Sequence, residues 1–158
     1  MVEFEIYILI HKPVEMVLQA FLNLENMPYY TTDLERIEVI KDEPEFVGSV
    51  LHLHYRKKGR SYVMEDKLEY CEPGKKYISR VTGDVLSAMV EISFDASDPG
   101  KTKMNLSWSG QGKVLFLRLF LPLIRGRIKR QARIELEKFK ELVETFGVDF
   151  RESQYVST

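Results

Sequence analysis

Cysteine and histidine are scarce in this sequence, and their scarcity excludes several kinds of site. Cys71 is the only cysteine among the 158 residues, so the chain forms no internal disulfide and no zinc site made of several cysteines. We expect a reduced thiol in a cytoplasmic protein. The 3 histidines stand in no Ser/His/Asp or Cys/His arrangement that would indicate nucleophilic catalysis, and the sequence has no phosphate loop.

Long hydrophobic runs are also missing. The longest run, VLFLRLFLPLI over residues 114–124, is interrupted by Arg118 and Pro122 and is shorter than the ~20 residues that span a membrane. The start of the chain, MVEFEIYILI, carries Glu3 and Glu5 and lacks the basic region of a signal peptide. A net charge of −1 points to no particular partner. The composition, 44% hydrophobic and 30% charged, is typical of a soluble globular domain.

What the sequence does contain is a series of short strands between turns. Alternating apolar residues predict a first strand over about residues 4–10, and Pro13 suits the first position of a helix that continues to Phe21. Pro28 limits the next element, within residues 25–32, to a short helix or a turn. Strand patterns follow over residues 36–40, 49–56, 61–70, 76–83, 87–95 and 102–110.

The last part of the chain has helical periodicity. One apolar stripe predicts a single long helix that begins near Pro122 and ends before Gly147. The stripe consists of Ile124, Ile128, Ala132, Leu136, Phe139, Val143 and Phe146.

These elements predict an α+β fold. We expect a curved, seven-stranded antiparallel sheet wrapped around the long C-terminal helix, with two short helices between the first two strands. A sheet that curls around one helix has more inner surface than the helix fills, so a cavity between them is expected. Residues 1–148 are expected to form this single domain, and residues 149–158 a polar, frayed tail.

Hairpin geometry predicts which side chains face the helix. Three tight turns set the register, and it directs alternate residues inward while His52 and His54 face outward. The predicted cross-strand pairs are Tyr55–Tyr62, Leu53–Met64, Leu51–Asp66, Tyr70–Tyr77, Leu68–Ser79, Asp66–Val81, Phe94–Thr102, Ile92–Met104, Val90–Leu106 and Ala88–Trp108.

His52 and His54 have a spacing that a metal site can use. On the outward face, however, only Glu65 is expected nearby, and a two-histidine site needs a further ligand. His11 stands at a strand-to-helix turn with no second histidine or cysteine in reach. We therefore interpret these histidines as surface residues and expect no metal.

Asp66 is the exception on the predicted inner wall, which is otherwise apolar. A carboxylate in such a place must be paired, be hydrogen-bonded, or have its pKa raised. Two interpretations are open. Asp66 is satisfied by a tyrosine hydroxyl, an arginine or water, or it contacts a ligand and is then the candidate acid or base of an enzyme.

Residues 113–133, KVLFLRLFLPLIRGRIKRQAR, are here called the basic-apolar segment. The segment carries a charge of +7 and no acid, which leaves −8 on the rest of the chain. Three interpretations are open. The apolar residues pack on the core while the arginines are solvated, the segment is a mouth or lid of the cavity that attracts an anionic head group or an acidic membrane surface, or it binds another protein or RNA. Because no aromatic stacking platform lies on a basic strand face, we expect no nucleic acid.

Two stretches of the chain resemble a known superfamily. They are ILIHKPVEMVLQAFLNLENMPYYTTDLERIEVI (residues 8–40) and VGSVLHLHYRKKGRSYVMEDKLEYCEPGKKYISRVTG (residues 47–83). Their strand-to-helix opening, their NMPYY segment and their CEPGKK hairpin resemble the START-like (SRPBCC, Bet v 1-like) superfamily, in its polyketide cyclase/dehydrase branch. The resemblance covers about residues 3–146. The sequence departs from it at Tyr29 and Tyr30, where a tryptophan is usual.

The resemblance implies a helix-grip fold with a cavity between the sheet and the C-terminal helix. Members of the superfamily bind lipids, sterols, polyketides, plant hormones or quinones, and a minority are aromatase/cyclases or hydrolases. They share no universal catalytic residue, so the resemblance assigns none here.

We interpret the protein as a carrier or sensor of a hydrophobic small molecule, such as a lipid, a quinone or isoprenoid, or a polyketide, without catalysis and without a cofactor. The alternatives are a cyclase or dehydratase that uses Asp66, and a module that docks on a membrane or partner through the basic-apolar segment. The expected ligand-binding residues are Tyr30, Leu51, Leu53, Tyr55, Met64, Asp66, Leu68, Tyr70, Val90, Ile92, Met104, Leu106, Trp108, Phe120, Ile124 and Ile128.

Overall fold

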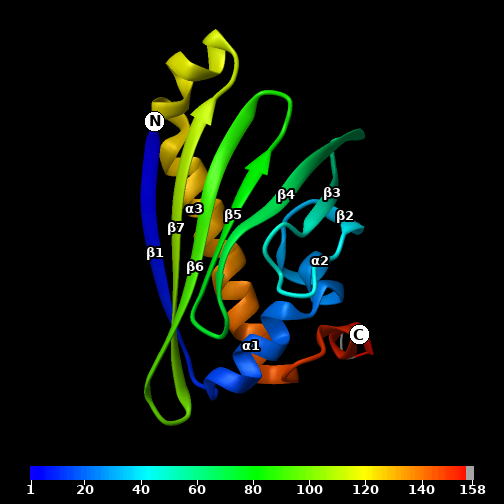
Figure 1. Cartoon of the computed structure of the whole chain (residues 1–158), viewed down its shortest axis with the longest axis vertical. Helices are drawn as coiled ribbons and strands as arrows, with labels where there is room; N and C mark the ends of the chain where they lie inside the picture. The colour runs from blue at the N-terminus through cyan, green and yellow to red at the C-terminus, as the bar shows by residue number, and fades with distance from the viewer. Residues whose placement is uncertain (156–158) are drawn as a thin grey trace.

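The computed structural model describes residues 1–155, apart from the side chain of Ser97, as one sheet, one long helix and several short helices (Figure 1). The strands are β1 (Val2–Ile10), β2 (Leu34–Lys41), β3 (Val50–Lys57), β4 (Arg60–Glu72), β5 (Lys76–Thr82), β6 (Leu86–Asp98) and β7 (Lys101–Gly112). The α-helices are α1 (Val14–Leu22), α2 (Met27–Tyr30) and α3 (Leu115–Phe146), and the 3-10 helices are η1 (Leu24–Asn26) and η2 (Phe150–Tyr155).

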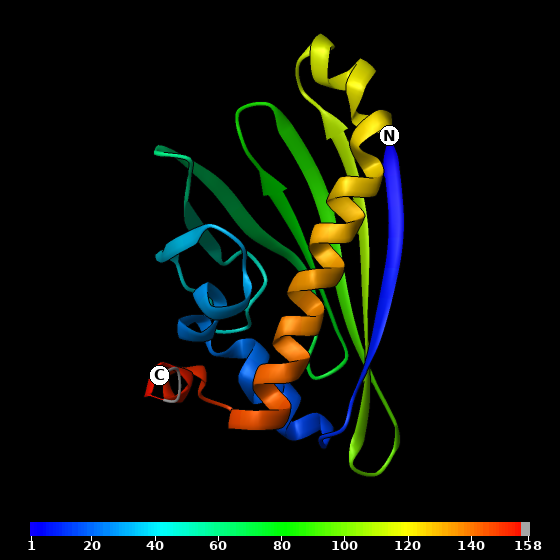
Figure 2. The same cartoon turned by 180° about the vertical axis from the view of Figure 1, so that it is seen from behind.

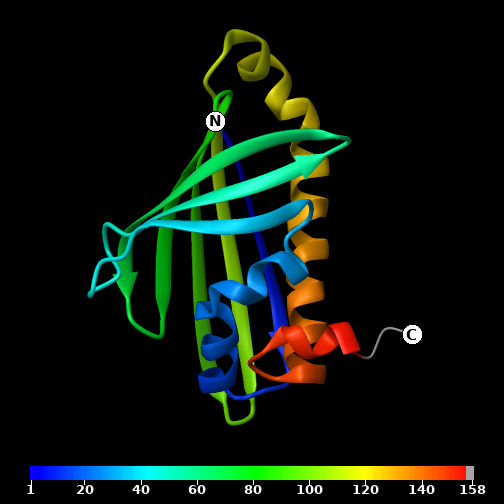
Figure 3. The ribbon, with the colours of Figure 1, turned by 90° about the vertical axis from the view of Figure 1, so that its right-hand side faces the viewer.

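The 7 strands form a single antiparallel sheet in the order β1-β7-β6-β5-β4-β3-β2. Helix α3 runs along the inner face of the sheet (Figure 2), and β2, β3 and part of β4 cross the direction of β1 and β7, so that the sheet curves around the helix (Figure 3). The short helices α1, η1 and α2 lie between β1 and β2. The predicted helix-grip architecture is therefore confirmed.

The core lies between α3 and the strands at the β1 edge of the sheet. Burial alternates strictly along β1, because successive side chains of a strand point to opposite faces. Its inward residues, such as Ile6 and Ile10, join the core that contains Leu136, Phe139 and Val143 of α3. This anchors the C-terminal half of α3 against one side of the sheet.

Helix α3 begins earlier than the sequence indicates. It starts at Leu115, and Pro122 lies inside it. Proline removes one backbone hydrogen bond from a helix, which is why the pattern favoured a start near residue 122. The predicted end is confirmed, because Gly147 follows the helix with a φ of 77° and its N–H donates to Val143 O at 2.9 Å.

The predicted register is confirmed for the first hairpin, partly wrong for the second and wrong for the third. Strands β3 and β4 pair as expected, including Leu51 with Asp66. Between Leu68 and Tyr70 a bulge shifts the pairing of β4 with β5, so that Tyr70 pairs with Ile78 instead of Tyr77. The bulge turns Tyr70 outward, and its side chain is 47% exposed.

The third hairpin is shifted by two residues from the prediction. Phe94 pairs with Met104 and Val90 with Trp108. Both strands continue further than expected toward a turn at Gly100, whose φ of 77° suits glycine. A shift of two residues keeps each side chain on the same face of the sheet, so the predicted facing survives the wrong pairing.

The C-terminal residues are not a frayed tail as far as the structure describes them. Phe150 begins η2, is fully buried, and contacts the rings of Tyr30 and Phe139. Its N–H donates to Asn26 Oδ1 at 2.9 Å, and the Asn26 amide nitrogen donates to Val148 O at 2.9 Å. The buried asparagine thus holds the end of the chain against η1, and residues 156–158 of the expected tail lie outside the described residues.

Candidate functional site

A cavity of about 450 Å³ lies between α3 and the sheet. A volume of this size is in the range of small-molecule sites. Its lining residues come from the short helices (Phe21, Leu22, Leu24, Met27, Tyr30, Thr31), from β2 and the loop after it (Val39, Lys41, Asp42, Phe46, Ser49), from β3 to β7 (Leu51, Asp66, Leu68, Tyr77, Ser79, Val81, Val90, Ile92, Met104, Leu106) and from α3 (Ala132, Glu135, Leu136, Phe139).

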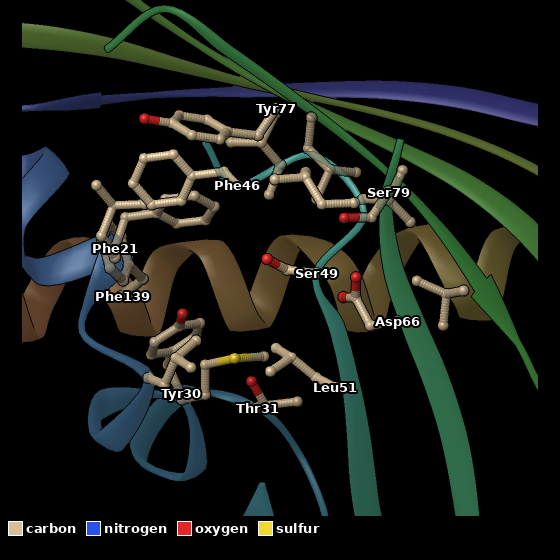
Figure 4. A pocket seen from close by; sticks show the side chains of 18 of the residues that line it. Phe21, Tyr30, Thr31, Phe46, Ser49, Leu51, Asp66, Tyr77, Ser79 and Phe139 are labelled. Atoms are coloured by element: carbon tan, nitrogen blue, oxygen red, sulfur yellow. The ribbon is translucent and has the colours of Figure 1, made fainter. Parts of the chain in front are cut away.

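Most of this lining is apolar, and aromatic rings support one end of it. Phe21 of α1 lies 5.7 Å from the Tyr77 ring, measured between ring centroids, and 5.2 Å from the Phe94 ring. Figure 4 shows Phe21 and Tyr77 beside the space, and Phe139 of α3 also lines it. Edge contacts of this kind hold aromatic side chains in fixed positions. This end of the cavity is therefore a preformed apolar surface.

Asp66 projects from β4 into the cavity, as the register of β3 and β4 predicts. Figure 4 shows its carboxyl group near the Ser79 side chain of β5. Burial raises the pKa of the Asp66 carboxyl above its usual range, and the hydrogen bond with Ser79 partly opposes the rise. Among the described residues, none forms an ion pair with Asp66. The group is thus a weakly satisfied acid in an apolar wall.

A second carboxyl group, Glu135 of α3, lines the same cavity. Its Oε1 accepts a hydrogen bond from Thr32 N at 3.0 Å and one from Gln131 Nε2 at 3.4 Å. Burial raises the pKa of Glu135, and the bonds from Thr32 and Gln131 oppose the rise. The helix and the sheet therefore each contribute one acid to the cavity.

Hydroxyl groups complete the polar part of the lining. Figure 4 shows the Tyr30 hydroxyl and the Ser49 hydroxyl turned into the same space as Asp66. The Tyr30 ring packs edge-on against Phe139, with 5.0 Å between centroids. Burial, with a further contribution from Glu135, raises the pKa of Tyr30, so this hydroxyl stays protonated and can donate.

Basic groups are nearly absent from the cavity. Among the lining residues of the described chain, Lys41 is the only cation. It lies at the exposed rim beside Asp42, and its Nζ is 3.0 Å from Glu43 Oε1. Nothing positive therefore faces Asp66 and Glu135 from inside the cavity.

The structure brings part of the predicted site together. The predicted residues that line the cavity are Tyr30, Leu51, Asp66, Leu68, Val90, Ile92, Met104 and Leu106. The predicted residues that do not line it are Leu53, Tyr55, Met64, Tyr70, Trp108, Phe120, Ile124 and Ile128.

The residues outside the cavity have other contacts. Tyr55 stacks on Tyr62 with 5.0 Å between ring centroids, and Trp108 stacks on Phe4 at 5.2 Å. The Trp108 ring also covers Gly110, where an added Cβ would come within 2.0 Å of a ring carbon. Tyr55 and Trp108 therefore pack against other aromatic rings and do not line the cavity.

Several lining residues were missed by the sequence analysis. Glu135 was not predicted as a lining residue because it lies beside the apolar stripe of α3 and not within it. Phe46 belongs to the loop between β2 and β3, whose course no periodicity predicts, and Ser49, which was predicted to begin a strand, is the residue just before β3. Ser79 and Val81 could have been predicted as lining residues, because the predicted pairing already placed them opposite Leu68 and Asp66.

The outward histidines have more acidic neighbours than expected. Glu65 lies 3.5 Å from His52 Nε2, and Glu38 of β2 lies 3.0 Å from His54 Nε2. The hydrogen bond from His54 lowers the pKa of Glu38. Within the part of the chain that the structure describes, no group of three or more His, Cys, Asp or Glu side chains is arranged to hold a metal ion.

The basic-apolar segment contributes Ala132 to the cavity, and its first turns do not line it, so the segment does not form a mouth or lid of the cavity. These turns project beyond the sheet at the end of the molecule away from α1 and α2 (Figure 1). Among residues 1–155, no helix is both long enough and apolar enough to cross a membrane.

The fold and the cavity define a START-like, polyketide cyclase-like ligand-binding domain. The family model described as "Polyketide cyclase / dehydrase and lipid transport" matches residues 1–144, and the chain belongs to this family. No curated protein sequence matches the chain significantly.

Solved structures share the fold. A START superfamily protein from Mycobacterium smegmatis has a TM-score of 0.72 and 14% identity, over 88% of this chain and 97% of that one. The Zhui aromatase/cyclase from Streptomyces sp. R1128 has a TM-score of 0.70 and 14% identity, over 89% and 92%. A conserved protein from Geobacillus kaustophilus has a TM-score of 0.75 and 11% identity, over 92% and 97%. At these identities the likeness concerns the fold alone.

Proposed function

We propose that this protein binds a hydrophobic small molecule, with a neutral or cationic polar end, in the cavity between α3 and the sheet. The observation that carries the proposal is an apolar cavity of about 450 Å³ with two buried acids, Asp66 and Glu135, in its wall. The one cation among the described lining residues, Lys41, lies at the exposed rim beside Asp42. The apolar lining supplies affinity by removing ligand surface from water. The family's description, which includes lipid transport, supports the same reading.

The polar groups favour one class of ligand end. Protonated Asp66 and Glu135 and the Tyr30 hydroxyl donate hydrogen bonds, which suit a hydroxyl or carbonyl oxygen. Ionised, the two acids suit an ammonium group. A carboxylate or phosphate would bring a negative charge to these groups with no cation to offset it, and burying such a charge is costly. Fatty acids are therefore poor ligands for this cavity.

Catalysis is a second candidate, which Asp66 supports. A carboxyl group with a raised pKa in a ligand cavity can act as a general acid, and the Tyr30 hydroxyl faces the same space. The fold likeness to an aromatase/cyclase is compatible with this role. A test is to incubate wild type and D66N with a bound ligand and to identify products by mass spectrometry. Conversion by wild type that D66N abolishes supports catalysis, while recovery of unchanged ligand from wild type favours a carrier.

The binding proposal is tested with a neutral fluorescent probe, Nile red, and three competitors that share one tail: dodecanol, dodecylamine and dodecanoate. We expect the probe to bind wild type, and dodecanol or dodecylamine to displace it. Dodecanoate should compete at least about tenfold more weakly at neutral pH, because its charge is buried without a partner. Native mass spectrometry of the purified protein identifies any ligand that remains bound.

Val90→Phe is the variant that fills the cavity, and Val63→Phe is its matched control. Val90 lines the cavity from β6, whereas Val63 lies exposed on the outer face of β4. V90F should weaken binding of the probe by about tenfold or more, since the phenylalanine ring occupies the space of the ligand. V63F should leave the affinity for the probe unchanged. Equal binding by wild type and V90F, or tightest competition by dodecanoate, would contradict the proposal.

A further inference from the structure

The first turns of α3 expose large apolar side chains to solvent. Leu115, Phe116, Leu119 and Leu123 are 72%, 69%, 67% and 76% exposed, and Phe120 is 43% exposed. Residues three and four apart share one side of a helix, so these side chains form a continuous outward face, here called the α3 tip. The rings of Phe116 and Phe120 lie 4.5 Å apart at its centre. Apolar surface concentrated in this way marks an interaction site.

These side chains are not part of the hydrophobic core. The inward side of the same turns is already packed, because Leu121 is buried and the backbone of Leu117 and Arg118 lies close to Gly112. Lys113 Nζ donates to Gly83 O at 3.0 Å, which ties the start of the helix to the turn after β5. The tip stands beyond the end of the sheet in Figures 1 and 3. Its apolar face is therefore held in place by the domain and covered by none of the described residues.

The charges next to the tip have one sign. Arg127 and Arg130 continue the outward side of α3 by the same three- and four-residue spacing, and both are exposed. Neither has an acidic partner among residues 1–155. The basic-apolar segment as a whole is +7, against −1 for the chain. An apolar end with a basic collar is thus presented away from the rest of the molecule.

We infer that the α3 tip docks this protein on a membrane surface that carries anionic lipids. Apolar and aromatic side chains at the end of a helix enter the boundary between head groups and acyl chains, and Lys and Arg behind them meet anionic head groups. The charges argue against a second copy of the chain as the occupant, because two tips that met would bring their basic collars together. The cavity lies toward α1 and α2, so docking leaves the cavity rim uncovered.

The test is co-flotation of the purified protein with two kinds of vesicle, phosphatidylcholine alone and phosphatidylcholine mixed with phosphatidylglycerol. Wild type should bind the anionic vesicles, bind the neutral ones more weakly, and lose affinity as salt is raised. Leu119→Ser with Leu123→Ser should weaken binding by at least about tenfold, because each leucine loses its transfer into the bilayer. Arg127→Gln with Arg130→Gln should weaken binding to anionic vesicles by about tenfold and leave the weak binding to neutral vesicles unchanged.

Control variants make substitutions of the same kind elsewhere on the surface. Leu9→Ser removes an exposed leucine from β1, and Lys57→Gln with Lys58→Gln removes two positive charges at the β3–β4 turn. Both controls should float like wild type. Circular dichroism and the melting temperature verify that all variants are folded.

Three results would overturn the inference. The first is failure of wild type to float with anionic vesicles, and the second is flotation of L119S/L123S equal to that of wild type. The third is a loss of flotation in the control variants as large as that in the tip variants. If sedimentation instead gives a dimer that L119S/L123S converts to a monomer, with no flotation, the tip is a contact between copies and the membrane inference is wrong.

Discussion

At the scale of single residues, the most consequential feature is a pair of acids without a cation. Asp66 and Glu135 enter one cavity from the sheet and from the helix, and burial raises the pKa of both. Ionising either group in this place costs free energy that ionising it in the unfolded chain does not. The two acids therefore make the stability of the unliganded protein depend on pH.

We predict that Asp66→Asn stabilises the protein more at neutral pH than in acid. The raised pKa means that the stability associated with protonated Asp66 is complete below about pH 4, where an unfolded aspartate titrates, and is lost as the pH rises through the folded value. Asparagine stays neutral and keeps an oxygen for Ser79, so it avoids that loss. The free energy of unfolding of D66N minus wild type should grow with pH, by about 1.4 kcal/mol for each unit of pKa shift. Urea denaturation at several pH values measures it.

Asp84→Asn is the control for this prediction. Asp84 is exposed at the turn between β5 and β6, so the same chemical change there removes a carboxyl group that is not buried, and the two variants are compared at each pH. A difference between D66N and wild type that does not change with pH would contradict the assigned environment of Asp66.

At the scale of elements, the packing of η2 against the rest of the domain is the feature that sequence patterns did not predict. The residues around Phe150 are mostly polar, and a polar terminus is usually frayed. One buried aromatic and one buried amide, Asn26, reverse that expectation, because Asn26 bonds to both Phe150 N and Val148 O. Through Tyr30, which contacts Phe150, the end of the chain also supports the cavity wall.

We predict that Phe150→Ala destabilises the protein by about 3–5 kcal/mol, the usual cost of removing a buried phenylalanine. It should also weaken ligand binding, since Tyr30 loses a ring that holds it. Arg151→Ala is the adjacent control, and its exposed ion pairs with Glu25 and Asp149 should contribute little to stability because solvent screens them. Urea denaturation and probe titration measure both effects. A loss below about 1 kcal/mol in F150A would mean that η2 is not part of the folded domain.

The register of the strands illustrates what sequence patterns predict well and what they do not. The short turn between β3 and β4 left one pairing that kept most apolar residues of the two strands on one face, and that pairing is correct. The bulge beside Glu69 changes the pairing by one residue without changing composition, so no pattern revealed that Tyr70 faces outward. A two-residue shift, as between β6 and β7, keeps each side chain on the predicted face of the sheet. It therefore changes few of the predicted site residues.

At the scale of the whole molecule, the architecture was predictable because it rests on periodicity. The apolar face of an alternating sheet and the apolar stripe of one long helix can be buried together in few arrangements. A curved sheet around a helix is one of them. The strand side of the cavity followed from that, with Asp66 in its predicted place. The remaining wall comes from Phe46, Ser49 and the short helices, whose positions depend on loop conformation and on tertiary contacts that local patterns do not encode.

Charge is also distributed at this scale, and its separation has a measurable consequence. The basic-apolar segment is +7 and the remainder −8, on a chain with a sequence pI of about 6.3. A uniform distribution would give no retention on a cation exchanger at neutral pH, whereas a clustered one gives a surface that binds it. We predict retention at low salt. R127Q/R130Q should elute at lower salt than K57Q/K58Q, although both variants have lost the same charge, because only the first loses it from the cluster. Co-elution of the two variants would show that the net charge, and not the cluster on α3, governs the interaction.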